Sequence, residues 1–173
     1  DRPGIVAAVS GILYKRNCNI ENVSQTILQS EFAGIFIVSM PEDLSLEMLK
    51  NAMTDVLHPL DLNVHIKPLH YQQSTYTSEE VEPFVITTKG PDRKGLVAGI
   101  TEIIAKHEVN ITNLQAVFKG GDEPGDNIMI YEVDVPVGID KKALDNELRQ
   151  RAKALSLDIS IQHRNIFEAI NRI

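Results

Sequence analysis

The sequence contains two short motifs whose residue types can bind a charged small molecule. The pattern D-R-x-G occurs twice, from Asp1 to Gly4 and from Asp92 to Gly95, and an amphipathic stretch follows each copy. We expect both glycines to stand where the chain turns into a helix, because glycine adopts positive φ without strain and lets a ligand approach the backbone. The first N–H groups of a helix can bind a carboxylate, and each aspartate adds an acceptor beside them. The pattern therefore predicts a zwitterion site, with the ligand carboxylate on the amides and its ammonium group on the aspartate.

Each part of this pattern also has a purely structural interpretation. The aspartate can cap its own helix while the glycine only makes the turn. The same holds for Asn19 and Asn110, which follow the two helices in N-I-E-N and N-I-T-N. Asparagine at a helix end commonly adopts the left-handed conformation that stops the helix. Its side chain also offers a ligand both a donor and an acceptor, so the residues alone leave both interpretations open.

The two motifs belong to an internal repeat that covers most of the 173 residues. Residues 1–26 align without a gap to residues 92–117, and ten of the 26 positions are identical. The second halves align at an offset of 95, which places Pro41 opposite Pro136. A period near 90 residues is too long for a solenoid repeat and indicates a duplicated small domain.

Each copy has the same order of predicted elements. Apolar residues at helical spacing predict a helix directly after each motif, and alternating apolar residues predict strands further on. Ser45 and Asp140 are the predicted N-caps of the second helix in each copy. The elements after the first helix are a strand (Ile20–Leu28 or Ile111–Phe118), an alternating strand through Phe36 or Tyr131, a helix (Leu46–Leu57 or Lys141–Ala154) and a last strand (Asn63–Pro68 or Asp158–His163).

One further strand, Pro83–Lys89, precedes the first helix of the second copy. The order βαββαβ predicts an α+β fold of two ferredoxin-like units, each with an antiparallel sheet and its helices on one face. The first copy begins at Asp1 without a counterpart, so we expect the first strand of unit one to be missing from the chain. The predicted organisation is unit 1 over 1–69, a polar linker over 70–82, unit 2 over 83–164 and a C-terminal tail, helical in character, over 165–173.

Composition and spacing narrow the possible functions. The net charge of −7 with scattered basic residues disfavours direct nucleic-acid binding. The single cysteine, Cys18, and the absence of an apolar run of membrane-spanning length predict a cytoplasmic protein without a membrane segment. The five histidines lack metal-ligand spacing, and the acidic stretch at 120–126 lacks the spacing of a calcium loop. We also find no nucleophile–base pair, so we predict no catalytic residues, no metal and no cofactor.

The combination of D-R-x-G, an amphipathic helix and N-I-x-N leading into a strand resembles the ACT domain, and it occurs twice over nearly the whole chain. Two such units with little else resemble the glycine cleavage system transcriptional repressor family. The resemblance implies that an amino acid binds between two units, against the loop before the first helix and the asparagine after it. The implied ligand-binding residues are Asp1, Gly4, Asn19, Asp92, Gly95 and Asn110. Lys94 stands where the first copy has Pro3, and some ACT domains have asparagine in place of the aspartate.

From this resemblance we predict a regulatory, amino-acid-sensing protein that is not an enzyme. It implies glycine or a similar small amino acid as the ligand, a homodimer as the assembly, and a protein partner such as a transcription regulator, with glycine cleavage as the regulated process. Two alternatives remain. The chain can be the regulatory fragment of a larger amino-acid or folate enzyme, or a ligand-free structural dimerisation module.

Overall fold

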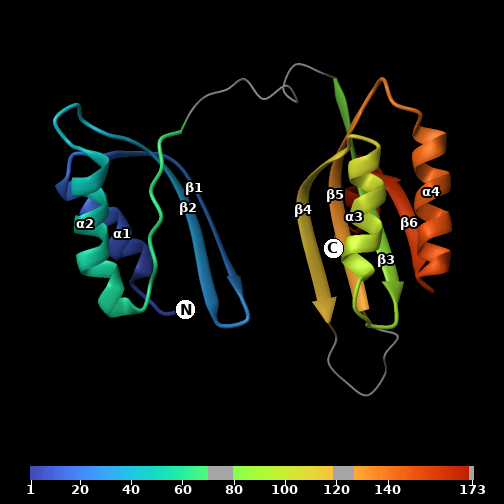
Figure 1. The fold of residues 1–173 in the computed structure, drawn as a ribbon, viewed down its shortest axis with the longest axis horizontal. Helices are drawn as coiled ribbons and strands as arrows, with labels where there is room; N and C mark the ends of the chain where they lie inside the picture. The colour runs from blue at the N-terminus through green and yellow to red at the C-terminus, as the bar shows by residue number, and fades with distance from the viewer. Residues whose placement is uncertain (70–79, 119–126, 172–173) are drawn as a thin grey trace. The chain divides into compact units, whose positions relative to one another are not determined.

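The computed structural model describes residues 1–69, 80–118 and 127–171. It divides the chain into two compact units, unit 1 (Asp1–Tyr71) and unit 2 (Gln72–Ile173). Figure 1 shows unit 1 in blue to green and unit 2 in green to red. Each unit combines helices with antiparallel strands, as the sequence predicts.

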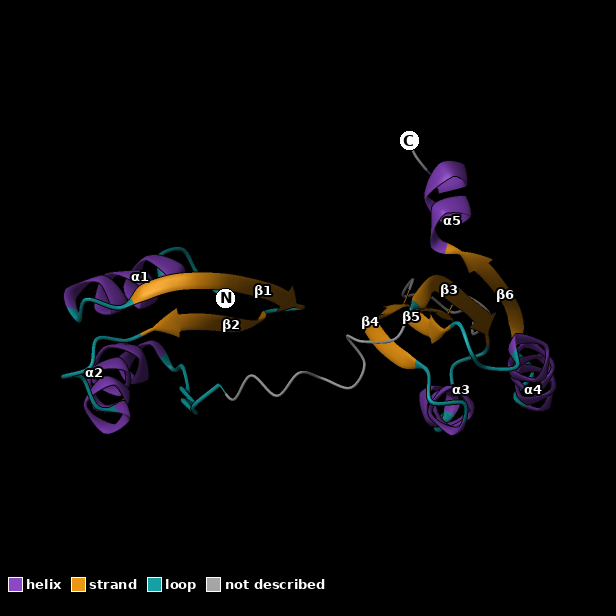
Figure 2. Cartoon of the chain, turned by 90° about the horizontal axis from the view of Figure 1, so that it is seen from above, coloured by secondary structure: helices purple, strands orange, loops and turns teal. Residues whose placement is uncertain are grey.

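Unit 2 is a four-stranded antiparallel sheet with α3 and α4 on one face (Figure 2). The strand order is β4-β5-β3-β6, and β3 pairs with β5 on one side and β6 on the other. This topology confirms the predicted βαββαβ unit. Its elements are β3 (Val81–Gly90), α3 (Leu96–Lys106), β4 (Asn110–Phe118), β5 (Asn127–Pro136), α4 (Lys141–Ala154), β6 (Asp158–His163) and the short helix α5 (Arg164–Asn171).

The core of unit 2 lies between the sheet and the two helices. Along β5 every second residue is buried, because successive side chains of a strand point to opposite faces. The helices contribute their apolar stripes, of which Ile100 in α3 and Leu148 in α4 are fully buried. The charged residues Glu132 and Asp134 alternate with the buried ones and stay partly exposed on the other face.

Unit 1 contains a two-stranded sheet and two α-helices. Its elements are α1 (Ile5–Lys15), β1 (Asn19–Leu28), β2 (Glu31–Ser39), α2 (Leu46–Leu57) and the 3-10 helix η1 (His58–Leu60). The helices meet the sheet in a core that includes Leu13 of α1 and Leu49 of α2. Ser45 caps α2 as predicted, since its Oγ accepts a hydrogen bond from the Met48 N–H at 3.2 Å.

The prediction of a last strand at Asn63–Pro68 is wrong, because this segment forms no strand. In unit 2 the equivalent strand β6 lies at the edge of the sheet and pairs with β3. The described part of unit 1 holds no counterpart of β3, so the segment has no neighbour with which to exchange backbone hydrogen bonds. Val64 and Ile66 still pack against the unit 1 core at alternate positions, which is the side-chain pattern of a strand without the pairing.

The two hairpins of the repeat pair in the same register. The β1–β2 pair has a bulge between Ile20 and Asn22, and the β4–β5 pair has one between Ile111 and Asn113. These positions are equivalent in the sequence repeat. Residues of the two units can therefore be compared position by position along these strands.

The N-cap of α4 generates a stability prediction. One carboxylate oxygen of Asp140, Oδ1, accepts hydrogen bonds from the N–H groups of Lys142 and Ala143, both at 3.0 Å. Asp140→Ala leaves both groups without this acceptor and should lower the free energy of unfolding by about 1 kcal/mol. Asp145→Ala is the control, because its exposed pair with Arg149 contributes about 0.5 kcal/mol or less. Urea unfolding followed by far-UV circular dichroism compares the two, and equal losses would contradict the capping role.

Candidate functional site

The D-R-x-G loops adopt the predicted backbone conformation. Gly4 has φ of 97° and Gly95 has φ of 90°, and each is the N-cap residue of the following helix. No side-chain hydrogen bond caps α1 or α3 in the part of the chain that the structure describes. The alternative in which Asp1 or Asp92 caps its own helix is therefore wrong, and both carboxylates are left for other contacts.

The first turn of α3 presents free backbone donors. The first bond within this helix runs from the Gly99 N–H to the Gly95 carbonyl at 2.9 Å. The N–H groups of Leu96, Val97 and Ala98 come before it, so they have no acceptor within the helix. Such groups carry the positive end of the helix dipole and favour an anion. No acidic residue stands in this first turn to neutralise them.

A surface pocket of about 450 Å³ lies at this end of α3, and we call it the α3 pocket. Its volume is within the range of small-molecule sites. The walls come from the loop before α3, the first turn of α3, and the strands β4 and β5. The lining residues are Asp92, Arg93, Gly95, Leu96, Val97, Ala98, Ala116, Asn127 and Met129. The structure thus brings together Asp92, Gly95 and the free amides of the helix.

Two charged side chains stand at the α3 pocket, both of them exposed. Asp92 offers a carboxylate to a cationic group, and Arg93 adds a positive charge to that of the helix amides. Sequence reasoning identified Asp92 but passed over Arg93. The pocket therefore combines donors for an anion with an acceptor for a cation, which is the arrangement that a zwitterion needs.

Asn127 is a polar lining residue that sequence reasoning missed. The residue is 5% exposed, and its side-chain amide oxygen has no hydrogen-bond partner among the described residues. Buried polar groups are nearly always paired, so an unpaired one at a pocket wall calls for an explanation. A signal was present in the sequence, because Asn127 stands two residues before Met129 on the buried side of an alternating strand.

Met129 links the α3 pocket to the core of unit 2. It lines the pocket, and its Sδ accepts a hydrogen bond from the Tyr131 hydroxyl at 3.5 Å. Burial raises the pKa of Tyr131 to about 12. The phenol therefore keeps its proton at neutral pH and remains a donor to the sulfur. This contact holds one wall of the pocket against the packed core.

The structure places Asn19 and Asn110 away from helix ends. Each is the exposed first residue of a strand, and Asn110 does not line the α3 pocket. The left-handed residues between helix and strand are Asn17, with φ of 54°, and Glu108, with φ of 57°. The interpretation of Asn19 and Asn110 as helix stops is therefore wrong, and their part in ligand binding stays a prediction.

The equivalent loop of unit 1 has different contacts. Asp1 and Gly4 stand before α1 as Asp92 and Gly95 do before α3. The Arg2 guanidinium, however, donates a hydrogen bond to the Leu60 carbonyl. Arg2 is thus engaged by its own unit, whereas its counterpart in unit 2 lines a pocket.

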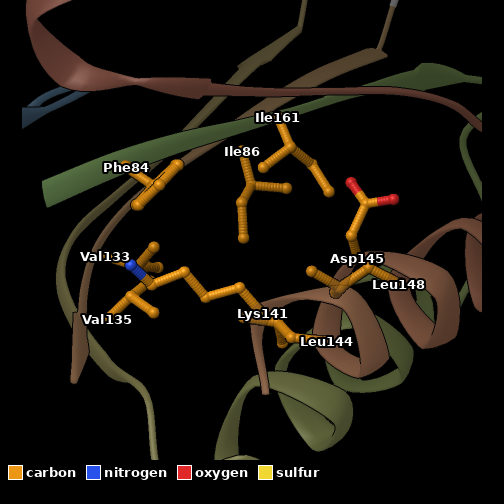
Figure 3. Close-up of a pocket in the computed structure, with 9 residues that line it drawn as sticks. All are labelled: Phe84, Ile86, Val133, Val135, Lys141, Leu144, Asp145, Leu148 and Ile161. Atoms are coloured by element: carbon orange, nitrogen blue, oxygen red, sulfur yellow. The ribbon is translucent and has the colours of Figure 1, made fainter. Parts of the chain in front are cut away.

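A second pocket in unit 2, of about 90 Å³, lies between the sheet and α4 (Figure 3). Its walls are apolar except for Lys141 and Asp145. Both of these side chains already have ion-pair partners, Glu82 at 2.6 Å and Arg149 at 2.8 Å. A polar ligand would find no free group to orient it there, so the α3 pocket is the better candidate site.

Other kinds of site find no support in the described ranges 1–69, 80–118 and 127–171. These ranges contain no group of three or more histidine, cysteine or acidic side chains that could hold a metal ion. The acidic stretch 120–126 lies outside them. Among the helices of the same ranges, none has the length and apolar character to cross a membrane.

Comparison with known sequences identifies the family. Residues 1–67 and 82–162 each match the ACT domain, which accounts for most of the chain. The chain belongs to the ACT domain family. Membership indicates a regulatory, amino-acid-sensing role and agrees with the tandem organisation read from the sequence.

Related sequences and structures are consistent with this assignment. The chain is 33% identical over 90 residues to a UPF0237 protein of Methanopyrus kandleri, and the match covers 51% of this chain and 96% of that protein. A crystal structure of an unknown protein from Galdieria sulphuraria is 22% identical with a TM-score of 0.69, covering 94% of this chain and 92% of that one. A structure described as a glycine cleavage system transcriptional repressor is 18% identical with a TM-score of 0.65, covering 94% and 90%. At these identities the two structures show a shared tandem ACT fold.

Gly95 generates a test of the loop geometry. Gly95→Ala places a side chain at φ of 90°, and this left-handed conformation costs an L-residue about 1–2 kcal/mol. The added methyl group itself meets no atom within 4 Å, so the loss of stability should come from the backbone. Gly138→Ala is the matched control, because Gly138 also has open space around its Cβ position but no positive φ.

Thermal and urea unfolding should find the Gly95 variant less stable and the Gly138 variant unchanged or slightly more stable. If both variants kept full stability, the left-handed turn before α3 would not be needed for the fold of unit 2.

Proposed function

We propose that this ACT protein is a regulatory sensor that binds a small amino acid in the α3 pocket. The observation that carries the proposal is the position of Asp92 beside the free amides of Leu96, Val97 and Ala98. The ligand carboxylate accepts from these amides, and the ligand ammonium group donates to the Asp92 carboxylate. The pocket is large enough for a small amino acid, and glycine is the simplest candidate.

The charge arrangement favours a zwitterion over a simple anion. Phosphate or a carboxylic acid would satisfy the helix amides and Arg93 but would bring negative charge close to Asp92. Like charges at such distances disfavour binding. An amino acid places opposite charges at the two ends of a short molecule and suits both groups.

The proposed output is a change in a protein–protein interaction. The sheet of unit 2 ends at β4, and an edge strand can pair with another chain. A ligand beside β4 would favour one assembly state through its differential affinity for two states. We therefore propose a homodimer that acts through a protein partner such as a transcription regulator. The likeness to a structure described as a glycine cleavage repressor supports glycine cleavage as the regulated process.

The proposed function requires ligand binding and no catalysis. A cytoplasmic location is also part of the proposal. The pocket offers one carboxylate, one guanidinium, one amide and backbone donors. These groups orient a ligand without a nucleophile and base in contact. The competing proposal, a structural module that uses no ligand, accounts for the fold but leaves the amide oxygen of Asn127 unexplained.

Ligand analogues test the two ends of the binding arrangement. Isothermal titration should find that at least one of the twenty amino acids binds, with glycine expected among them. The methyl ester of the bound amino acid lacks the carboxylate, and its N-acetyl derivative lacks the ammonium group. Each derivative should therefore bind at least about tenfold more weakly than the free amino acid. Tight binding of the ester would contradict recognition of the carboxylate by the α3 amides.

Asp92→Asn tests the acceptor for the ammonium group. The variant loses its negative charge, so affinity for the amino acid should fall about tenfold. Affinity for the N-acetyl derivative, a simple anion that Asp92 repels, should stay the same or rise. Its stability should stay near that of the wild type because Asp92 is exposed and caps no helix. Asp158→Asn, at the exposed start of β6 outside the pocket, is the control. An equal loss in both variants would mean that overall charge, and not the Asp92 contact, governs binding.

A further inference from the structure

The unpaired amide of Asn127 lies at the wall of the α3 pocket. The residue is 95% buried, since 5% of it is exposed, and its side-chain oxygen has no partner within the described residues. Leaving a buried acceptor unpaired destabilises the folded protein. Asn127 also shares the pocket with the free helix amides and Asp92. A ligand that donates a hydrogen bond would supply the partner that is missing among the described residues.

The internal repeat shows what occupies this position in the other unit. In the β4–β5 pair, Asn127 is the register partner of residue 118. In the β1–β2 pair, the equivalent partners are Ile27 and Phe32, because both pairs have the same bulge and the same offsets. Phe32 therefore stands where unit 2 has Asn127. By the same correspondence, Gly34 stands where unit 2 has Met129.

The residues around Gly34 are aromatic. A Cβ atom at Gly34 would lie 3.1 Å from Cζ of Phe32 and 3.0 Å from Cε2 of Phe36. The two rings thus cover the place that the Met129 side chain takes in unit 2. Phenylalanine has no group that accepts a conventional hydrogen bond from a ligand. Unit 1 therefore presents aromatic carbon where unit 2 presents an amide.

We infer that Asn127 is a ligand-binding residue of the α3 pocket and that each chain binds one amino acid, in unit 2. This inference rests on the proposed function. The Asn127 oxygen accepts a hydrogen bond from the ligand amino group, which Asp92 contacts from the solvent side. Unit 1 keeps the D-R-x-G loop and the ACT fold but lacks this acceptor. The duplication has thus produced one binding unit and one unit with an apolar counterpart of the site.

The experiment is titration calorimetry of the full chain with the tightest-binding of the twenty amino acids. We expect one ligand per chain for the wild type and an affinity about 10- to 100-fold lower for Asn127→Leu. The same variant should unfold at an equal or higher urea concentration, because an apolar side chain of similar size replaces an unpaired amide. A residue with a merely structural role would show the opposite, lost stability with unchanged affinity.

Two further variants make the test specific. Asn113→Leu is the matched control on β4, since Asn113 is exposed and its Nδ2 donates to Glu132 Oε1 at 2.9 Å, outside the pocket. It should bind like the wild type. Asn127→Ala is the second variant, because its smaller side chain fits the site without steric overlap. It should show the same loss of affinity, and it keeps the test available if the leucine variant fails to fold.

The possible failures are distinguishable. Wild-type binding of two ligands per chain would overturn the restriction of binding to unit 2. Full affinity in both Asn127 variants would overturn the role of Asn127. Either result would leave the proposed function standing. Failure of all twenty amino acids to bind the wild type would overturn both.

Discussion

The hydrogen bonds along both edges of β3 organise unit 2. β3 pairs with β5 and β6, so it sets the register of the sheet and carries the core residues Val85 and Ile86 between the other strands. The last residue of β3, Gly90, pairs with Asn127, the first residue of β5. The D-R-x-G loop that follows β3 therefore lies at the end of the sheet where β5 begins. The segment Asn63–Pro68 of unit 1 shows that a strand forms only beside another strand with which it can pair. Its apolar residues pack as those of a strand would, but without a neighbouring strand it forms no ladder.

The candidate site is made of groups that the fold leaves incompletely satisfied. The first amides of α3 have no acceptor in their helix, and Gly95 holds a positive φ with no capping side chain. Asn127 is buried with an unpaired oxygen in the described chain. The unpaired oxygen of Asn127 carries a cost in stability, and the packed core beneath, from Met129 and Tyr131 to the apolar stripes of α3 and α4, offsets it. A ligand that satisfies these groups would stabilise the folded unit by binding it and not the unfolded chain.

The two copies of the repeat show how one fold supports different chemistry. Their hairpins share a bulge and a register, and their first helices begin at left-handed glycines. The differences lie in single side chains. Unit 1 has Phe32 and Gly34 where unit 2 has Asn127 and Met129. Arg2 of unit 1 donates to the Leu60 carbonyl, whereas Arg93 of unit 2 lines a pocket. Changes of this kind leave the hydrogen-bonded frame intact, because strand pairing uses the backbone and the alternation of side chains is preserved.

Sequence patterns alone predict the duplication, the βαββαβ order of unit 2, the caps at Ser45 and Asp140, and the left-handed turns at Gly4 and Gly95. These features follow from local periodicity and from residue-specific backbone preferences, which a single chain reveals. Packing in the folded chain brings Asn127 and Arg93 to one pocket with Asp92, keeps Asn110 apart from it, and leaves Asn63–Pro68 unpaired with any strand of the described residues. These outcomes depend on which strand lies beside which and on which face of the sheet each side chain points to. They depend on contacts between distant segments, and the spacing of residues along one segment does not encode such contacts.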